Sequence, residues 1–361
     1  MMLPYFPIDL EKSFDELLEY QKKFIRGIDV LLNLKDTESN KTPKELFYKE
    51  DKMKVFHYKP LAKKVSKVPT LIIYALVNRQ YMMDIQQDRS VIKNLLELGL
   101  DLYIIDWGYP TAQDKYVTLE DYIDVYIENT VNEILKRTDS TKLNIIGVCQ
   151  GGTFSAIYTA LNPEKVKNLV TMVTPIDFEA GRMAKDGFLF KWSKDMNVDN
   201  LVDAYGVIPG QFLNGGFDFL KPFQLMLNKY VSIVDNLENP DTAANFIRME
   251  KWILDSPDQS GEAFRRFIKE LYQENRLIKG TFEIGGRVVD LKNITMPVLS
   301  ICGDEDHIVP PESTRPFLDY VGSKDKELVS YPIGHIGMYV SSKSHRVIAP
   351  KIAEWLLKRE K

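Results

Sequence analysis

The segment GVCQG at residues 147–151 has the spacing of a nucleophile elbow whose central residue is a cysteine. The apolar run 143–146 precedes it and a run with helical periodicity follows it, so Cys149 stands in a strand–turn–helix context. Glycine is needed at both ends of the segment because a side chain there would crowd so sharp a turn. A cysteine in this position can attack an acyl group, and Cys149 is our candidate nucleophile. The alternative is a small, buried and unreactive cysteine.

A cysteine nucleophile requires a general base, and the base requires a group that orients it. Enzymes with this elbow carry both groups on loops after later strands, in the chain order nucleophile, acid, base. His335 follows the segment 327–331 and lies between small residues, so it is the candidate base. The loop 303–311 offers the acid, and we prefer Asp306 to Asp304 because it stands a few residues before a Val-Pro pair.

The sequence contains 4 histidines, and the other three fit the role of base less well. His57 precedes the elbow in a strand-like run and is expected to be structural. His345 is expected at the surface near the start of a helix. His307 is a rival base, but its neighbour Asp306 would turn it elsewhere if that carboxylate faces the site.

Backbone N–H groups are expected to form an oxyanion hole beside the nucleophile. One belongs to the residue after the nucleophile, here Gln150, and the second to the loop after an earlier strand. That loop is 75–81, in which Val77 is the preferred donor and Asn78 the alternative. The scattered cysteines and histidines lack the spacing of a metal site, and the glycine-rich turn lacks the ending of a P-loop. We therefore expect no metal and no cofactor.

Short apolar strands alternate with amphipathic helices along most of the chain, which predicts a mostly parallel sheet with helices on both faces. Together with the elbow, this pattern predicts an α/β-hydrolase fold. Residues 1–50 are predicted to form a helical leader, and residues 51–174 and 291–361 the core. The insertion 175–290 is rich in aromatic residues and Met, and we interpret it as a largely helical cap over the strand ends. An independent helical domain is the alternative for this insertion. The expected strands are 70–76, 102–106, 143–146, 168–174, 297–302 and 327–331.

Composition narrows the classes of protein to consider. The chain has 361 residues and a formal net charge of -4, which argues against a general nucleic-acid binder. Its 2 cysteines cannot form a disulfide framework, so a reducing compartment fits best. The first residues have no signal-peptide pattern, and no apolar run has the length of a membrane span. We expect a cytoplasmic protein without a transmembrane segment.

Several blocks of the sequence together resemble the catalytic subunit of class III polyhydroxyalkanoate synthases, over residues 3 to 358. The resemblance implies an α/β-hydrolase fold with a cap and a triad of Cys149, Asp306 and His335. It also implies short-chain 3-hydroxyacyl-CoA substrates, a second, non-catalytic subunit in a homo- or hetero-oligomer, and residence at the surface of polyhydroxyalkanoate granules. The long N-terminal extension of the single-subunit synthases is missing, and the class IV enzymes, with a different small partner, are the alternative. The blocks are YALVNRQYMMDIQQDRS, DWGYP, GVCQGG, VTMVTPIDF, RMEKWILDSPDQSGE, DHIVPP and GHIGMYV.

A cysteine nucleophile suits polymer growth from CoA thioesters such as 3-hydroxybutyryl-CoA. Transfer to Cys149 exchanges one thioester for another, so the acyl group stays activated for attack by a 3-hydroxyl. CoA is then part of the substrate and a released product, and the other product is a polyester. The alternatives are a Cys-His-Asp thioesterase or dienelactone-type hydrolase, which would release free acid, and a non-catalytic binding protein of the same fold.

Overall fold

The computed structural model describes residues 10–34, 37–218 and 237–360, which form two compact units. The smaller unit comprises Met1–Glu38 and Lys221–Lys251, and the larger unit comprises Ser39–Leu220 and Trp252–Lys361. In the smaller unit, Arg26 in helix α1 (Leu10–Asn33) forms an ion pair of 2.6 Å with Glu238. Within these described ranges, no helix is both long and apolar enough to cross a membrane.

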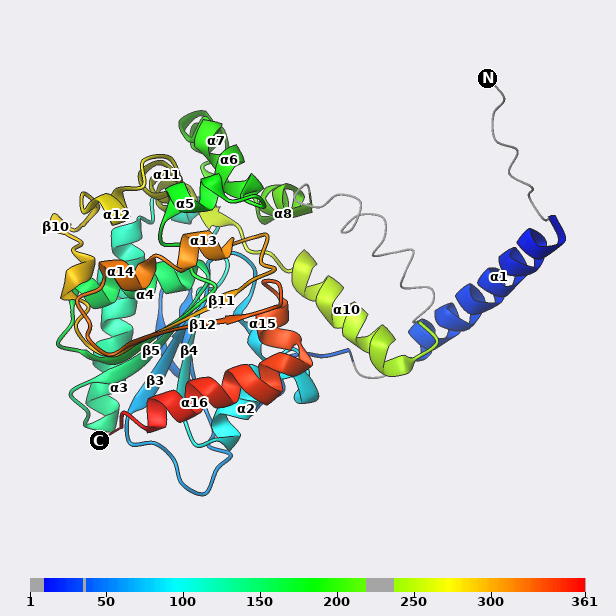
Figure 1. Cartoon of the computed structure of the whole chain (residues 1–361), viewed down its shortest axis with the longest axis horizontal. Helices are drawn as coiled ribbons and strands as arrows, with labels where there is room; N and C mark the ends of the chain where they lie inside the picture. Colours follow the sequence, from blue (N-terminus) through cyan, green and yellow to red (C-terminus); the bar gives the residue numbers. More distant parts are fainter. Residues whose placement is uncertain (1–9, 35–36, 219–236, 361) are drawn as a thin grey trace. The chain divides into compact units, whose positions relative to one another are not determined.

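The larger unit is built on an 8-stranded sheet in the order β1-β2-β4-β3-β5-β6-β11-β12 (Figure 1). β2 pairs antiparallel with β1 and with β4, and all the remaining pairs are parallel. The mostly parallel sheet of an α/β-hydrolase fold is thereby confirmed. The strands are β1 (Lys44–Glu50), β2 (Met53–Tyr58), β3 (Pro69–Ile73), β4 (Asp101–Asp106), β5 (Leu143–Val148), β6 (Val166–Met172), β11 (Val298–Gly303) and β12 (Lys326–Tyr331).

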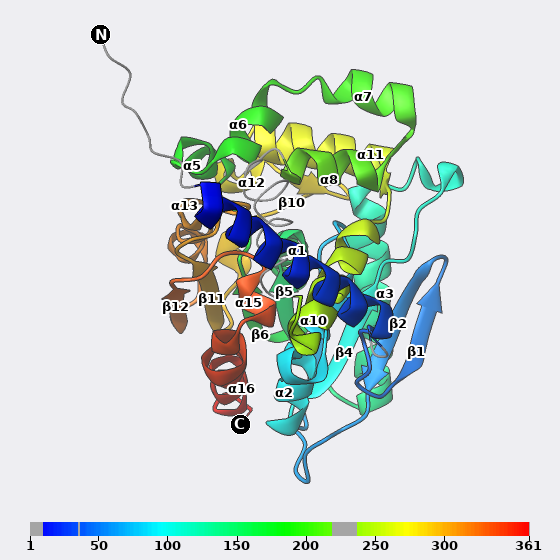
Figure 2. The same cartoon turned by 90° about the vertical axis from the view of Figure 1, so that its right-hand side faces the viewer.

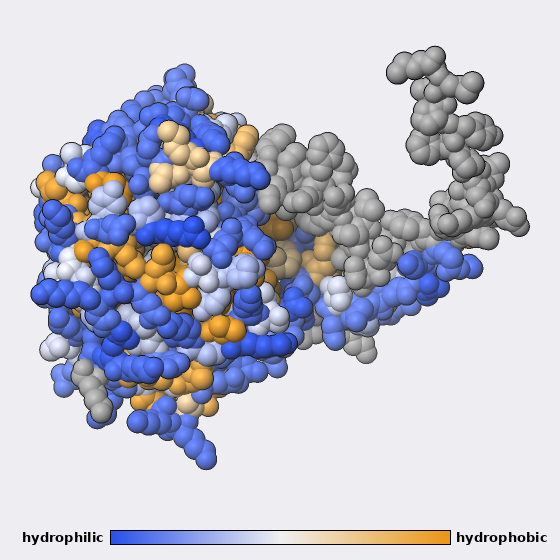
Figure 3. Space-filling model, in the orientation of Figure 1, coloured by the Kyte–Doolittle hydropathy of each residue, from blue (hydrophilic) through white to orange (hydrophobic). Residues whose placement is uncertain are grey.

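Helices cover both faces of this sheet. α2 (Val91–Glu97) and α16 (Ala349–Leu357) pack together on one face, as Figure 2 shows. α3 (Glu128–Thr138) and α4 (Gln150–Leu161) cover the other face, with a π-helix (Asp121–Ile127) leading into α3. The strands between them are continuous apolar runs because parallel strands are buried on both sides. On the face of the larger unit that Figure 3 shows, hydrophilic residues predominate and several groups of apolar residues lie among them.

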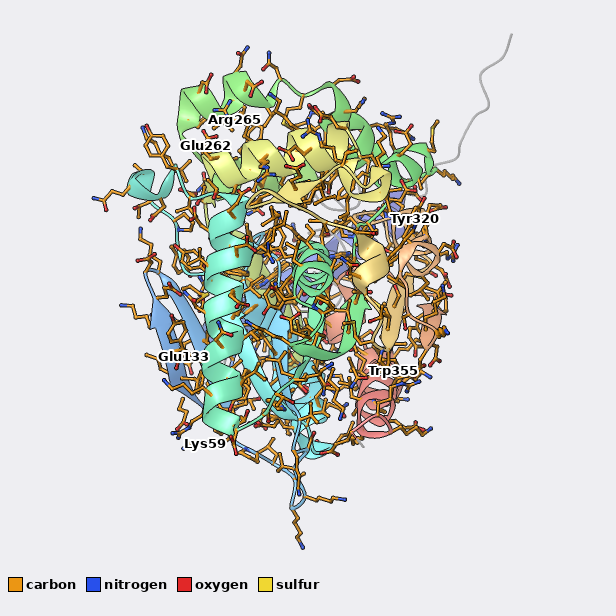
Figure 4. The ribbon with its side chains drawn as sticks, turned by 90° about the vertical axis from the view of Figure 1, so that its left-hand side faces the viewer. Lys59, Glu133, Glu262, Arg265, Tyr320 and Trp355 are labelled. Atoms are coloured by element: carbon orange, nitrogen blue, oxygen red, sulfur yellow. The ribbon has the colours of Figure 1, made fainter. Side chains whose placement is uncertain are left out.

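Short helices from the insertion lie together at one end of the sheet (Figure 1). Arg265 in α11 joins two of them, because it donates to Asp199 at 2.7 Å and to Asp203 at 2.6 Å, both in α7. Figure 4 labels Arg265 and its near neighbour Glu262 on α11. The helices are α5 (Phe178–Met183), α6 (Phe188–Asp195), α7 (Val198–Tyr205), α8 (Gly210–Asp218), α11 (Gly261–Arg266), the π-helix η6 (Phe267–Gln273) and α12 (Arg276–Lys279).

Two boundaries differ from the sequence-based expectation. The stretch 1–50 contains the helix α1, but Lys44–Glu50 forms strand β1, which pairs with β2. β1 is an edge strand of mixed charged and apolar residues, so it lacks the apolar run that marks the central strands. The insertion 175–290 is divided between the units, because Lys221–Lys251 groups with α1.

The elbow between β5 and α4 is held by close backbone contacts. Cys149 has φ 55° and ψ −126°, a conformation that non-glycine residues adopt only where the surroundings impose it. A Cβ atom on Gly151 would lie 2.2 Å from the carbonyl oxygen of Ile73 and 2.5 Å from that of Tyr74. The start of α4 therefore approaches the end of β3 so closely that only glycine fits.

We predict that Gly151→Ala lowers the free energy of unfolding by about 2 kcal/mol, because backbone of β3 must move to admit the methyl group. The measurement is urea denaturation followed by circular dichroism. Gly215→Ala is the matched control, since a Cβ there meets no atom within 4 Å in the described part of the chain. Alanine in this helical position should be neutral or stabilise by up to about 1 kcal/mol. Equal stability of the two variants would contradict the close approach.

Candidate active site

Two loops after neighbouring strands bring His335 and Asp306 together. β11 and β12 are parallel and pair Gly303 with Tyr331, so the loops that follow them start side by side. His335 Nδ1 lies 2.7 Å from Asp306 Oδ2. The second carboxylate oxygen of Asp306 accepts from the backbone N–H groups of Ile308 and Val309, each at 2.9 Å. Asp306 is 2% exposed and His335 6%, so both side chains are buried and only a small part of the histidine is accessible.

The sulfur of Cys149 completes this group. Cys149 is partly exposed, and its side chain lies close enough to His335 to raise the pKa of that histidine. Because Nδ1 faces Asp306, the second ring nitrogen, Nε2, is the atom left for the sulfur. Burial lowers the pKa of His335, but the negative charges of Asp306 and Cys149 outweigh burial and raise it to about 10. The structure therefore brings all three sequence-predicted residues into one contact series.

The residues considered as alternatives lie elsewhere or have other partners. Asp304 accepts from Arg315 at 2.7 Å and is more exposed than Asp306. His57 bonds to Asp101 at 2.7 Å, at the start of β4, and so at the opposite end of the sheet from the elbow. His345, expected at the surface, is only partly exposed, and burial lowers its pKa. His307 is likewise partly buried, in the loop next to Asp306.

The loop after β3, where the second oxyanion donor is expected, is tied to the elbow. The side-chain oxygen of Gln150 accepts from the backbone N–H of Leu76 at 3.0 Å. Val77 follows and is partly buried, and Asn78 has φ 57°. Donation by the N–H groups of Gln150 and Val77 to a substrate stays a prediction. The side-chain link is a feature that the sequence did not reveal, since it depends on a contact between distant segments.

Arg79 fixes the other end of this loop. Its guanidinium donates to Asp106 at 2.8 Å and to the carbonyl oxygen of Gly108 at 3.1 Å, and it lies 4.2 Å from the ring of Tyr109. The carbonyl oxygen of Arg79 accepts from the indole of Trp252 at 2.7 Å. A buried, paired arginine with four partners holds its backbone in place, so the loop between Leu76 and Arg79 is anchored at both ends.

The charge of Cys149 acts on tyrosines from three separate segments. Tyr74 follows β3, Tyr272 lies in η6, and Tyr339 follows His335 in α15 (Gly337–Val340). Burial raises the pKa of each, and the charge of Cys149 raises it further, so the three hydroxyls remain neutral. Sequence analysis missed them, although Tyr74 and Tyr339 stand in the blocks YALVNR and GHIGMYV.

Aromatic rings from the insertion pack around Tyr272. The ring of Tyr272 lies 4.7 Å from that of Phe178 and 4.9 Å from that of Phe190, centre to centre. Phe267 packs against the same group at 5.8 Å from Tyr272. Helices α5, α6 and η6 thus form a buried aromatic cluster around Tyr272. Such a cluster can exclude water from a bound acyl group.

Comparison with known proteins supports the fold and identifies the family. A family model for the alpha/beta hydrolase fold matches residues 68–341, and a model for the poly-beta-hydroxybutyrate polymerase (PhaC) N-terminus matches residues 36–95. Among solved structures, the monoacylglycerol lipase of Paleococcus ferrophilus is similar with a TM-score of 0.54, covering 82% of this chain and 96% of the lipase. At 18% identity, this likeness concerns the fold alone.

Curated relatives match along the whole chain. A poly(3-hydroxyalkanoate) polymerase subunit PhaC from Synechocystis sp. is 47% identical, with 100% of this chain and 97% of the relative covered. The subunit PhaC of Allochromatium vinosum is 48% identical, with 98% of this chain and 100% of the relative covered. Both matches cover at least 98% of this chain at an identity near one half. The chain therefore belongs to the PhaC family of poly(3-hydroxyalkanoate) polymerase subunits.

Proposed function

We propose that the chain polymerises short-chain 3-hydroxyacyl-CoA, such as 3-hydroxybutyryl-CoA, into polyhydroxyalkanoate and releases CoA through a thioester on Cys149. The observation that carries this proposal is the contact series from Cys149 through His335 to Asp306 in a member of the PhaC family. In this proposal Cys149 is the nucleophile, His335 the general base and acid, and Asp306 the group that orients His335.

In the first half of the reaction, the acyl group moves from CoA to the enzyme. The raised pKa of His335 means that its ring already holds the proton given up by the Cys149 thiol, and the sulfur attacks the thioester carbonyl carbon as a thiolate. The N–H groups of Gln150 and Val77 stabilise the negative oxygen of the tetrahedral intermediate. The bond to the CoA sulfur then breaks, and His335 returns the proton to the leaving thiolate. One thioester replaces another, so little free energy is lost.

In the second half, the polymer grows by one ester bond. The 3-hydroxyl of another unit gives its proton to His335 and attacks the carbonyl carbon of the Cys149 thioester. The carbon–sulfur bond breaks, and the proton passes to the Cys149 sulfur. Water would cleave the same thioester. The aromatic cluster of Tyr272, Phe178 and Phe190 supports a reaction in which water is kept away from it.

The insertion, the partner and the location complete the proposal. The aromatic helices of residues 175–290 in the larger unit act as a cap over the nucleophile. A second, non-catalytic subunit joins the chain in an oligomer, as the relatives' name "polymerase subunit" suggests for them. The insoluble product keeps the complex at the granule surface. Met183, Phe188 and Trp192, which are 75%, 47% and 37% exposed, are apolar groups suited to such contacts.

Replacing the proposed nucleophile tests covalent catalysis directly. With 3-hydroxybutyryl-CoA, the unaltered chain should release CoA and form insoluble polyester with little free acid. Cys149→Ala should lower CoA release by a factor of about 10⁴ or more, because no other group attacks in its place. Free acid equal to the CoA released would instead identify a thioesterase.

Alkylation separates Cys149 from the second cysteine. Iodoacetamide should label Cys149 first, since Cys302 is 1% exposed and burial raises its pKa. Peptide mapping by mass spectrometry gives the labelled site. Cys302→Ala is the matched control and should keep CoA release. Inactivation that follows labelling of Cys302 would count against the assignment.

Asp306 offers a test of how the two halves differ. A thiol loses its proton more readily than an alcohol, so attack by Cys149 should depend less on the acid than attack by a 3-hydroxyl. Asp306→Asn should therefore retain measurable single-turnover CoA release but slow steady polymer growth much more, whereas His335→Gln should suppress both.

Asp304→Asn is the matched control for this experiment, because Asp304 pairs with Arg315 instead of His335. It should retain both phases at close to the unaltered rate. Equal losses in the two phases for Asp306→Asn would reduce its role to orienting His335. An unaltered rate with Asn at 306 would shift the acid to Asp304.

The proposed second subunit should affect turnover. The isolated chain is expected to be weakly active with a long lag, and the non-catalytic subunit from the same source should raise the initial rate of CoA release severalfold. The added subunit alone must release no CoA. A purified chain that polymerises at full rate, and that no added subunit improves, would refute this part of the proposal.

A further inference from the structure

The hydroxyl of Tyr339 is a buried polar group that the proposed reaction does not use. Tyr339 lies one helical turn after His335 in α15 and is 0% exposed. Its ring meets the His335 ring edge-on, with 5.9 Å between centres, and lies 6.2 Å from the ring of Tyr74. Among the residues that the structure describes, Tyr339 Oη has no hydrogen-bond partner.

A buried hydroxyl without a partner is unfavourable, and most such groups in proteins are satisfied. Two other interior tyrosines of this chain follow the rule. Tyr158 donates to Glu128 at 2.7 Å, and Tyr122 lies 3.2 Å from the hydroxyl of Ser260. Phenylalanine would fill the Tyr339 site without this cost. The unpaired hydroxyl is therefore available to a bound substrate.

The surroundings of the hydroxyl point to the acyl group on Cys149. The edge-on contact with the His335 ring places the Tyr339 ring next to the proposed base of the site. Burial, and then the charges of Tyr74, Cys149 and Asp306, raise the pKa of Tyr339, so the phenol stays a neutral hydrogen-bond donor. In the proposed reaction, His335 already interacts with the sulfur, and backbone N–H groups already donate to the carbonyl oxygen. The oxygen on C3 of the acyl group, a few bonds from the sulfur, has no donor in that scheme.

We propose that Tyr339 Oη donates a hydrogen bond to the oxygen on C3 of the acyl group held by Cys149, an inference that rests on the proposed function. In the first unit this oxygen is the free 3-hydroxyl. After chain growth it is the single-bonded oxygen of the ester. Both forms accept a hydrogen bond, so one donor serves every round. Tyr339 thereby selects 3-oxygenated acyl groups over plain fatty acyl groups.

The test compares two substrates in Tyr339→Phe, which removes only the hydroxyl. Single-turnover CoA release from 3-hydroxybutyryl-CoA should fall roughly tenfold, the effect of one lost neutral hydrogen bond in an apolar site. Release from butyryl-CoA, which has no oxygen on C3, should stay within about twofold of the unaltered chain. The melting temperature should stay the same or rise, because a buried unpaired hydroxyl has been removed.

Thr159→Val is the matched control. Thr159 Oγ1 is also buried without a partner in the described part of the chain, but it lies near the far end of α4 from Cys149. This variant should keep or gain stability and keep both rates.

Three results would overturn the inference: an equal loss with both substrates, a loss that accompanies a lower melting temperature, or no loss at all. A chain that releases no CoA from 3-hydroxybutyryl-CoA, with Tyr339 intact, overturns the proposed function and this inference together. If the unaltered chain polymerises 3-hydroxybutyryl-CoA and Tyr339→Phe shows no selective loss, the inference fails and the proposed function stands.

Discussion

The close approach of α4 to the end of β3 is the constraint on which the site depends. Glycine at 151 lets the helix start against the carbonyl oxygens of Ile73 and Tyr74, and a Cβ on Gly152 would lie 1.9 Å from Thr174 Oγ1. These contacts impose the conformation of Cys149, whose side chain is presented at the turn between β5 and α4. Strain of this kind persists only because rigid strands on both sides enforce it.

The parallel register of β11 and β12 supplies the rest of the geometry. It brings the loops of Asp306 and His335 to the same edge of the sheet as the elbow, since β5, β6, β11 and β12 all run in one direction. Asp306 uses both carboxylate oxygens, one for His335 and one for backbone N–H groups. A fully bonded buried carboxylate cannot rotate away from the histidine, so the pair is oriented before any substrate binds.

Much of this arrangement was predictable from the sequence because it is written in local patterns. Apolar runs mark the parallel strands, and the elbow and the chain order of Cys149, Asp306 and His335 need no knowledge of distant contacts. β1 was not predicted as a strand, because this edge strand carries charged residues at exposed positions. The division of the insertion between two units could not be predicted, because it depends on contacts between segments that are distant in the sequence. The influence of Cys149 on Tyr272 and Tyr339 could not be predicted for the same reason.

The hydrogen bond from Leu76 to the Gln150 side chain has a consequence for product length. It links the first residue of α4, which follows the nucleophile, to the loop expected to stabilise the oxyanion, and so restrains their relative positions. A polymer repeats the same two transfers many times, and its length is the ratio of the growth rate to the termination rate. If the geometry of the site is the same in every round, that ratio depends on how often water reaches the proposed thioester. The mean length of the polyester would then report on solvent access to the proposed Cys149 thioester.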